Sequence, residues 1–202
     1  MTAVIDPRHL MPETITEYRA RYAGHASHIL SVPEFLTANT ALIIARFLGE
    51  QVPWLTTYHI SSRGSVDRDA WDAAPAGDRF FKAGLLEAHV AAAAKGRDAD
   101  AYRKLTAAFH SHRFLSWLEA VTAFRLGRLR LVARAFRKHE YAGAHIDDAG
   151  DRRLAWTLYL TPRWRPSFGG MLELKGRGGD FSLMRIGSSK VFYASEKIHY
   201  VK

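Results

Sequence analysis

Two residues with metal-binding side chains lie close together in the last third of the chain. Only Ile146 separates His145 from Asp147. If this segment is a β-strand, the two residues share one face and both can bind one metal ion. His199 follows further on. Two histidines and one carboxylate form the open ligand set typical of non-haem Fe(II) sites. A His-x-Asp pair is a weak motif by itself in a chain with 10 histidines, because most such pairs are surface residues.

The composition is that of an ordinary globular protein. With 202 residues, 48% hydrophobic and 24% charged, the chain is expected to form one domain with a sizeable core. It has no cysteine, which excludes disulfides, thiolate metal sites and a cysteine nucleophile. The start lacks the pattern of a signal peptide, and no apolar run approaches the ~20 residues of a membrane helix. We therefore expect a cytoplasmic protein without membrane contact.

The charge balance is strongly basic, with a net charge of +9 and a pI near 10.0. Such a balance suits a nucleic-acid surface, an anionic substrate or cofactor, or solubility alone. The basic residues are widely spread and include no recognisable nucleic-acid motif, so a nucleic-acid partner is not the prediction.

Helix signals dominate the first 123 residues. Apolar residues at helical spacing predict helices at 38–50 and through most of 78–123. β-Branched and aromatic residues predict strands at 26–37 and 53–60. The segment 61–78 is rich in Gly, Ser, Asp, Ala and Pro and is expected to be a surface loop.

From residue 124 the apolar period changes from 3.6 to 2. Leu129, Leu131 and Ala133 alternate with residues that include Arg130 and Arg134, which predicts a half-buried strand with a basic solvent face. Further strands are predicted at 152–161, 170–175 and 190–194. Helices in 1–123 and strands in 124–202 indicate an α+β fold. Its expected core is a double-stranded β-helix, that is a jelly-roll or cupin-like pair of antiparallel sheets, supported by the N-terminal helices.

Four segments, in order, resemble the Fe(II)- and 2-oxoglutarate-dependent dioxygenases of the prolyl-4-hydroxylase-like branch. Residues 139–147 are similar to the approach to the family's His-x-Asp motif, and 152–164 are similar to its R…YLN…W strand. Gly169–Leu174 resembles its GG-x-L strand, and 191–201 resembles the strand pair that ends in the distal histidine. Four ordered motifs make a far stronger signal than one.

The resemblance implies roles for five residues. His145, Asp147 and His199 would bind Fe(II), with 2-oxoglutarate as cosubstrate and O2 as oxidant. Tyr141 and Tyr159 are candidate hydrogen-bond partners of 2-oxoglutarate, although ordinary strand aromatics would fit both positions equally well.

One part of the family pattern is absent from this sequence. The family binds the distal carboxylate of 2-oxoglutarate with an Arg or Lys on the strand after the distal histidine, whereas this sequence ends at Lys202, shortly after His199. We therefore expect the C-terminal strand to be missing. No internal arginine can be assigned to the role from sequence.

The resulting prediction is a single domain over 1–202 that hydroxylates an unactivated C–H bond of an amino acid, peptide or natural product. Succinate and CO2 would be the co-products, and 61–123 is where a lid and substrate contacts are expected. The same chemistry also permits desaturation or ring formation. The alternatives are a catalytically silent jelly-roll binding module and a nucleic-acid demethylase of the same chemistry. The oligomeric state is not predicted.

Overall fold

The fold was determined as a computed structural model of the 202-residue chain. It describes residues 4–25, 28–146, 153–162, 165, 172–175, 181–182, 188–193 and 198–201. For residues 144–146, and for the described residues from 172 onward, the structure gives the backbone and the strand pairing.

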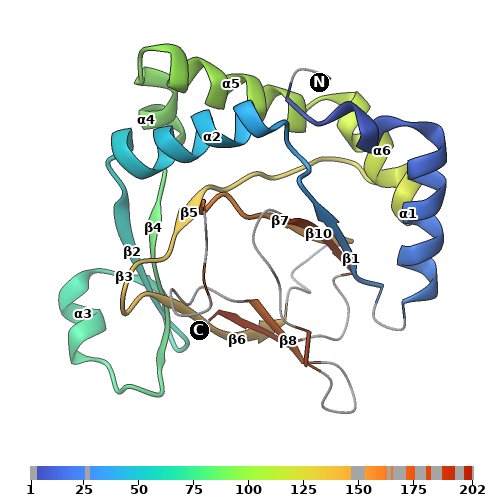
Figure 1. The fold of residues 1–202 in the computed structure, drawn as a ribbon. Coiled ribbons are helices and arrows are strands. Elements are labelled where there is room, and N and C mark those ends of the chain that lie inside the picture. Colours follow the sequence, from blue (N-terminus) through green and yellow to red (C-terminus); the bar gives the residue numbers. More distant parts are fainter. Residues whose placement is uncertain are drawn as a thin grey trace.

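A small antiparallel sheet has the order β1–β10–β7 (Figure 1). Its strands are β1 (Leu30–Pro33), β10 (Ser188–Tyr193) and β7 (Leu154–Leu158). Leu30 is opposite Val191, and Lys190 is opposite Thr157. β1 is an edge strand that ends at Pro33, a position that suits proline because it lacks the amide hydrogen that an inner strand needs.

Helices cover this sheet on one side (Figure 1). They are α1 (Pro12–Gly24), α2 (Ala38–Arg46) with its π-helical extension η2 (Phe47–Gln51), α4 (Ala88–Ala93), α5 (Arg97–Phe109) and α6 (His112–Thr122). Thr37 and Ser111 cap α2 and α6, because their side-chain oxygens accept hydrogen bonds from the amides of Thr40 and Phe114.

Aromatic side chains fill the space between these helices and the sheet. The ring centroids of Phe109 and Phe114 lie 4.7 Å apart, and those of Phe35 and Trp117 lie 5.1 Å apart. Trp156 of β7 meets Phe109 edge-on at 4.9 Å. Because each such ring buries a large apolar area, this cluster is the main hydrophobic core.

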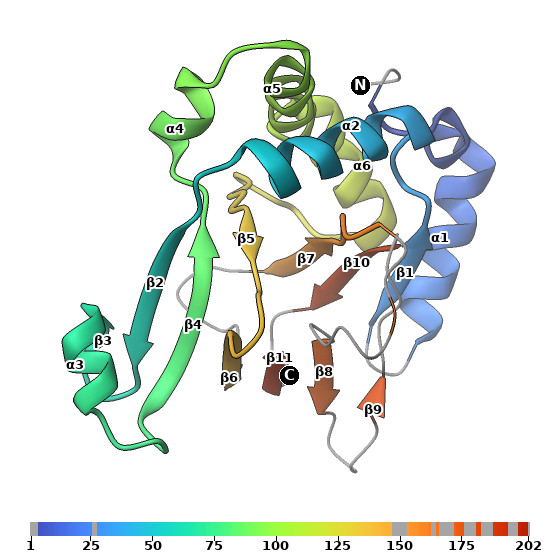
Figure 2. The same ribbon diagram turned by 60° about the vertical axis from the view of Figure 1, so that its left-hand side comes forward.

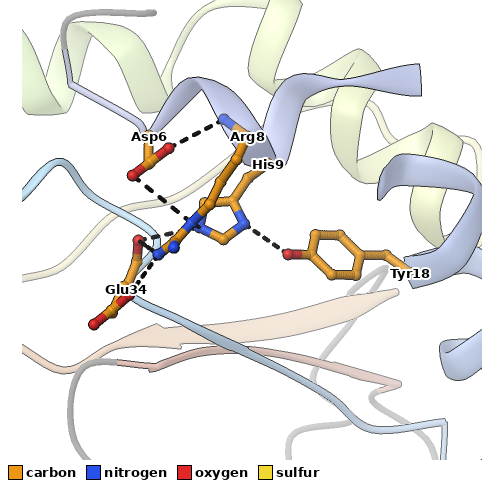
Figure 3. Close-up of polar contacts among 5 residues, drawn as sticks. All are labelled: Asp6, Arg8, His9, Tyr18 and Glu34. Atoms are coloured by element: carbon orange, nitrogen blue, oxygen red, sulfur yellow. Dashed lines mark hydrogen bonds and ion pairs between the residues drawn. The ribbon is translucent and has the colours of Figure 1, made fainter. Parts of the chain in front are cut away.

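A polar network holds the N-terminal segment against α1 and the turn that follows β1 (Figure 3). His9 lies in the short helix η1 (Pro7–Leu10) and is only 3% exposed. Its Nδ1 is 2.6 Å from the Tyr18 hydroxyl, and its Nε2 is 3.0 Å from the Glu34 carbonyl oxygen. Both ring nitrogens are satisfied when Nε2 carries the proton and Nδ1 accepts from Tyr18. Nearby, Arg8 forms an ion pair with Glu34 at 2.6 Å.

A second, larger antiparallel sheet has the order β3–β2–β4–β6–β11–β8–β9, and β5 also pairs with β4 (Figure 2). Its strands are β2 (Leu55–Ile60), β3 (Gly64–Val66), β4 (Arg79–Leu85), β5 (Arg134–Ala135), β6 (Tyr141–Ile146), β8 (Leu172–Lys175), β9 (Phe181–Ser182) and β11 (Ile198–Val201). Helix α3 (Arg68–Ala73) lies against the outer face of β2, where Trp71, Ile60 and Ala74 form a small separate core.

Two predictions for the first 123 residues are wrong. The expected loop at 61–78 contains β3 and α3, and the expected helix after residue 78 begins with strand β4. Phe81 and Leu85 are four residues apart, which suits a helix, but Phe81, Ala83 and Leu85 also alternate as a strand requires. Pairing with β2 and β6, which are distant in sequence, decides for the strand.

The alternating pattern after residue 124 is confirmed in its burial. Leu129, Leu131 and Ala133 pack against the main core, whereas Arg130 and Arg134 are exposed. Only Arg134–Ala135 is paired as a strand in this part of the chain. An extended segment can bury alternate residues against helices even when it has no strand partner. A paired strand and an unpaired extended segment therefore show the same alternating sequence pattern.

Candidate active site

The two candidate metal-binding histidines lie on neighbouring strands of the large sheet. His145 is in β6 and His199 is in β11, and the antiparallel register makes them direct partners. Direct partners share one face of a sheet, with Cα atoms about 4.5–5.5 Å apart. This placement suits two imidazoles that bind one metal ion. Asp147, the third candidate, lies outside the described residues.

An irregularity in β6 lies just before His145. Val201 is opposite Ala142, so three steps along β6 match two along β11. The extra residue is a β-bulge, and it brings Ala142 and His145 onto the same face although they are three residues apart. Gly143 lies in this bulge. A Cβ atom there would be 3.0 Å from the carbonyl oxygen of Phe80, so β4 approaches β6 closely because residue 143 has no side chain.

The two faces of the large sheet carry different residues. On the outer face, Lys82 of β4 is opposite Tyr58 of β2 on one side and Tyr141 of β6 on the other. The rings of both tyrosines contact Trp71 of α3. The inner face is the one turned away from α3, toward β5 and the small sheet (Figure 2). Phe81 and Ala142 are partners on this inner face. The register therefore assigns the histidine pair to the inner face.

Tyr141 makes its polar contact on the outer face. Its hydroxyl donates a hydrogen bond of 3.0 Å to the backbone carbonyl of Arg79, and its ring lies 6.2 Å from that of Trp71. Tyr141 would have to leave these contacts to reach a ligand bound beside His145. Its role in cosubstrate binding stays a prediction from the sequence.

Tyr159 directly follows β7 in the small sheet. Desolvation by the surrounding protein strongly raises the pKa of its phenol. Like an ordinary tyrosine, it is protonated at neutral pH, and its hydroxyl can act as a hydrogen-bond donor. This property suits a side chain that binds a carboxylate.

Sequence reasoning missed a group of residues on the inner face. Arg134 of β5 lies over the ring of Phe81, with its guanidinium carbon 4.6 Å from the ring centroid. Its Nη1 donates to the Thr57 hydroxyl at 3.2 Å. His59 meets Phe81 edge-on at 5.4 Å, and desolvation, followed by the charge of Arg134, lowers the pKa of its imidazole. The alternating pattern identified Arg134 only as part of a solvent face, because the sequence does not reveal that this face lines the inside of the sheet.

The part of the chain that the structure describes offers no rival metal site, since no three His, Asp or Glu side chains gather there around a common point. Within the same residues, none of the helices combines the length and apolar character that crossing a bilayer requires.

Solved structures with a similar fold cover nearly the whole chain. A prolyl-4-hydroxylase from Pseudomonas putida has a TM-score of 0.60 at 16% identity, over 93% of this chain and 90% of that one. A prolyl hydroxylase from Trichoplax adhaerens, in complex with a hypoxia inducible factor oxygen degradation domain peptide fragment, has a TM-score of 0.62 at 12% identity, over 95% and 87%. An oxidoreductase of the 2OG-Fe(II) oxygenase family from Burkholderia pseudomallei has a TM-score of 0.57 at 15% identity, over 93% and 83%.

Sequence comparison identifies the family directly. No curated protein matches the chain. The family described as "Oxoglutarate and iron-dependent oxygenase degradation C-term" matches residues 1–189, which is most of the sequence. Fe(II), 2-oxoglutarate and O2 are the cofactor and cosubstrates of this family and of its prolyl hydroxylase neighbours. The chain therefore belongs to the oxoglutarate- and iron-dependent oxygenases.

Proposed function

We propose that the protein hydroxylates an unactivated C–H bond of an amino acid, peptide or natural product, with succinate and CO2 as co-products. In this proposal His145, Asp147 and His199 hold Fe(II), and the two sheets are the halves of a double-stranded β-helix. The observation that carries the proposal is the direct partnership of His145 and His199 in the register of β6 and β11. Two imidazoles on one face of adjacent strands are donors that suit Fe(II).

The metal and cosubstrate supply the oxidising chemistry when they are bound, and the protein supplies binding, orientation and exclusion of water. The bulge in β6 brings His145 onto the face of Ala142, and His199 meets it from β11. Asp147 follows His145 by two residues and is proposed to complete the ligand set. Tyr159, whose pKa is raised, is proposed to donate a hydrogen bond to a carboxylate of 2-oxoglutarate.

A peptide is one of the substrate classes in this proposal. The Trichoplax adhaerens prolyl hydroxylase binds a peptide fragment. Its fold is similar to this one. An extended peptide can lie along the inner face of an antiparallel sheet. Peptide screening should therefore precede screening of smaller substrates.

The metal site can be tested by anaerobic titration with Fe(II) and then 2-oxoglutarate, with the visible charge-transfer band of the ternary complex as the readout. We expect the band in the wild type and its loss in His145→Ala and Asp147→Ala. Metal affinity should fall by more than the 10–100-fold that removal of an outer-shell partner typically costs. His89→Ala is the matched control, because His89 is exposed on α4. Unchanged metal binding in His145→Ala and Asp147→Ala would refute the assignment.

A further inference from the structure

Arg134 places a positive charge on the inner face of the large sheet. It belongs to β5, opposite Leu85 of β4. Its guanidinium stacks over Phe81 at 4.6 Å, and the Thr57 hydroxyl accepts a hydrogen bond from its Nη1 at 3.2 Å. Thr57 in turn donates to the carbonyl oxygen of Ala83 at 3.1 Å, which fixes the direction of its own hydroxyl. The guanidinium is thus held by a ring and a hydroxyl, and donors remain for a further partner.

This charge has no acidic partner among the residues that the structure describes. The ion pairs found there join other residues, and none includes Arg134. Its surroundings oppose the charge, since desolvation and the charge of Arg130 both lower the pKa of Arg134. Its side chain nevertheless stays exposed and can be reached by a ligand. A partly desolvated cation without a counter-charge is costly, and an anionic ligand would remove that cost.

The register also gives the separation between Arg134 and the histidine pair. Phe81, which lies under the guanidinium, is opposite Ala142, and the β11 partner of Ala142 is two residues from His199. Sheet spacings of about 4.8 Å across strands and 3.4 Å along them place Phe81 roughly 8 Å from His145 and roughly 12 Å from His199. A five-carbon dicarboxylate attached at one end to a metal ion between the histidines can extend over such a distance.

We infer that Arg134, oriented by Thr57, binds the remote carboxylate of 2-oxoglutarate while the 2-oxo acid end binds the metal beside His145 and His199. The inference rests on the proposed function. Guanidinium and carboxylate suit each other in geometry as well as charge, because two parallel N–H donors can meet the two carboxylate oxygens. An acidic group on the substrate has the same chemistry and is the competing source, so the test must be made without substrate.

The test compares two cosubstrate probes on the protein loaded with Mn(II), by calorimetric titration in the absence of any substrate. 2-Oxoglutarate has the remote carboxylate, and 2-oxopentanoate carries a methyl group in its place. The variants are Arg134→Met, which keeps the length and apolar stem, and Arg134→Lys, which keeps the charge. Arg130→Met is the matched control, because it removes the same charge from an exposed position four residues earlier.

We expect Arg134→Met to weaken 2-oxoglutarate binding by about 10- to 100-fold, as loss of a charge-assisted hydrogen bond does, and Arg134→Lys to weaken it less. Binding of 2-oxopentanoate should be the same in all variants, and Mn(II) affinity should not change. Equal 2-oxoglutarate affinity in wild type and Arg134→Met, or equal losses for both probes, would overturn the inference and leave the metal site standing. Failure of the wild type to bind Mn(II) would instead remove the proposed function on which the inference rests.

Discussion

Replacing Gly143 with alanine tests how the metal strand is positioned. The new Cβ would lie 3.0 Å from the Phe80 carbonyl oxygen and 3.1 Å from its ring carbon Cδ2, whereas ordinary contacts begin at 3.4 Å. One of the two atoms belongs to the backbone of β4 and cannot turn away. β4 and β6 would therefore have to separate by a few tenths of an ångström.

The expected cost can be estimated from two opposing effects. Overpacking costs about 1–3 kcal/mol. The loss of backbone freedom in the unfolded chain offsets about 0.4–1 kcal/mol of this. The free energy of unfolding should fall by about 1–2 kcal/mol, which lowers the melting temperature by about 2–8 °C in a chain of this size. Because the separation occurs two residues before His145, metal affinity should fall as well.

The measurements are thermal unfolding and Mn(II) titration of the same protein samples. Gly77→Ala is the control, since no atom lies within 4 Å of a Cβ added at that exposed turn position. It should raise the free energy of unfolding by about 0.4–1 kcal/mol, because only the loss of freedom in the unfolded chain remains. If the Gly143→Ala protein has the melting temperature and the Mn(II) affinity of the wild type, the close approach of β4 and β6 does not constrain the site.

Two further predictions concern the helical side of the protein. Burial lowers the pKa of His9 below its ordinary value near 6.5. The unfolded chain therefore binds a proton at His9 more readily than the folded chain does. The contribution of neutral, buried His9 to the free energy of unfolding is complete above about pH 6.5 and is lost as the pH falls from there through the folded-state pKa of His9. Denaturant unfolding at several pH values should show this loss in the wild type. If the free energy of unfolding of His9→Gln changed with pH as steeply as that of the wild type, the prediction would be contradicted. Asp98 accepts hydrogen bonds from Arg46 and Gln51 and joins α5 to α2, and the Arg46 hydrogen bond lowers the pKa of its carboxyl. Asp98→Asn should lower the unfolding midpoint at neutral pH more than Asp69→Asn does at an exposed position, and equal midpoints would refute a structural role for this ion pair.

The segment around Arg134 shows how far local patterns reach. The alternation at 129–135 correctly indicates which residues are buried, because burial on one side of an extended chain needs only a period of two. It does not show that Arg134 faces the inside of a sheet, since that depends on pairing with β4. The pattern after residue 78 predicts a helix where the structure has β4, because the strand partners of β4 are far away in the sequence.

The sequence by itself determined the family and the chemistry. Four ordered motifs can be recognised without coordinates, and the family match over residues 1–189 confirms the family they indicate, whereas the three metal ligands stay a prediction. The helices α5 and α6 also follow from the local spacing of apolar residues.

Tertiary structure alone decided which residues meet. The partnership of His145 with His199 is set by the register of two strands more than 50 residues apart in sequence, and a bulge beside Gly143 sets their common face with Ala142. Pairing of β4 with β6 places Tyr141 on the face of Trp71, and pairing of β5 with β4 brings Arg134 over Phe81. Strand register depends on long-range hydrogen bonds, and one added residue exchanges the faces of a strand, so no local pattern can fix these contacts.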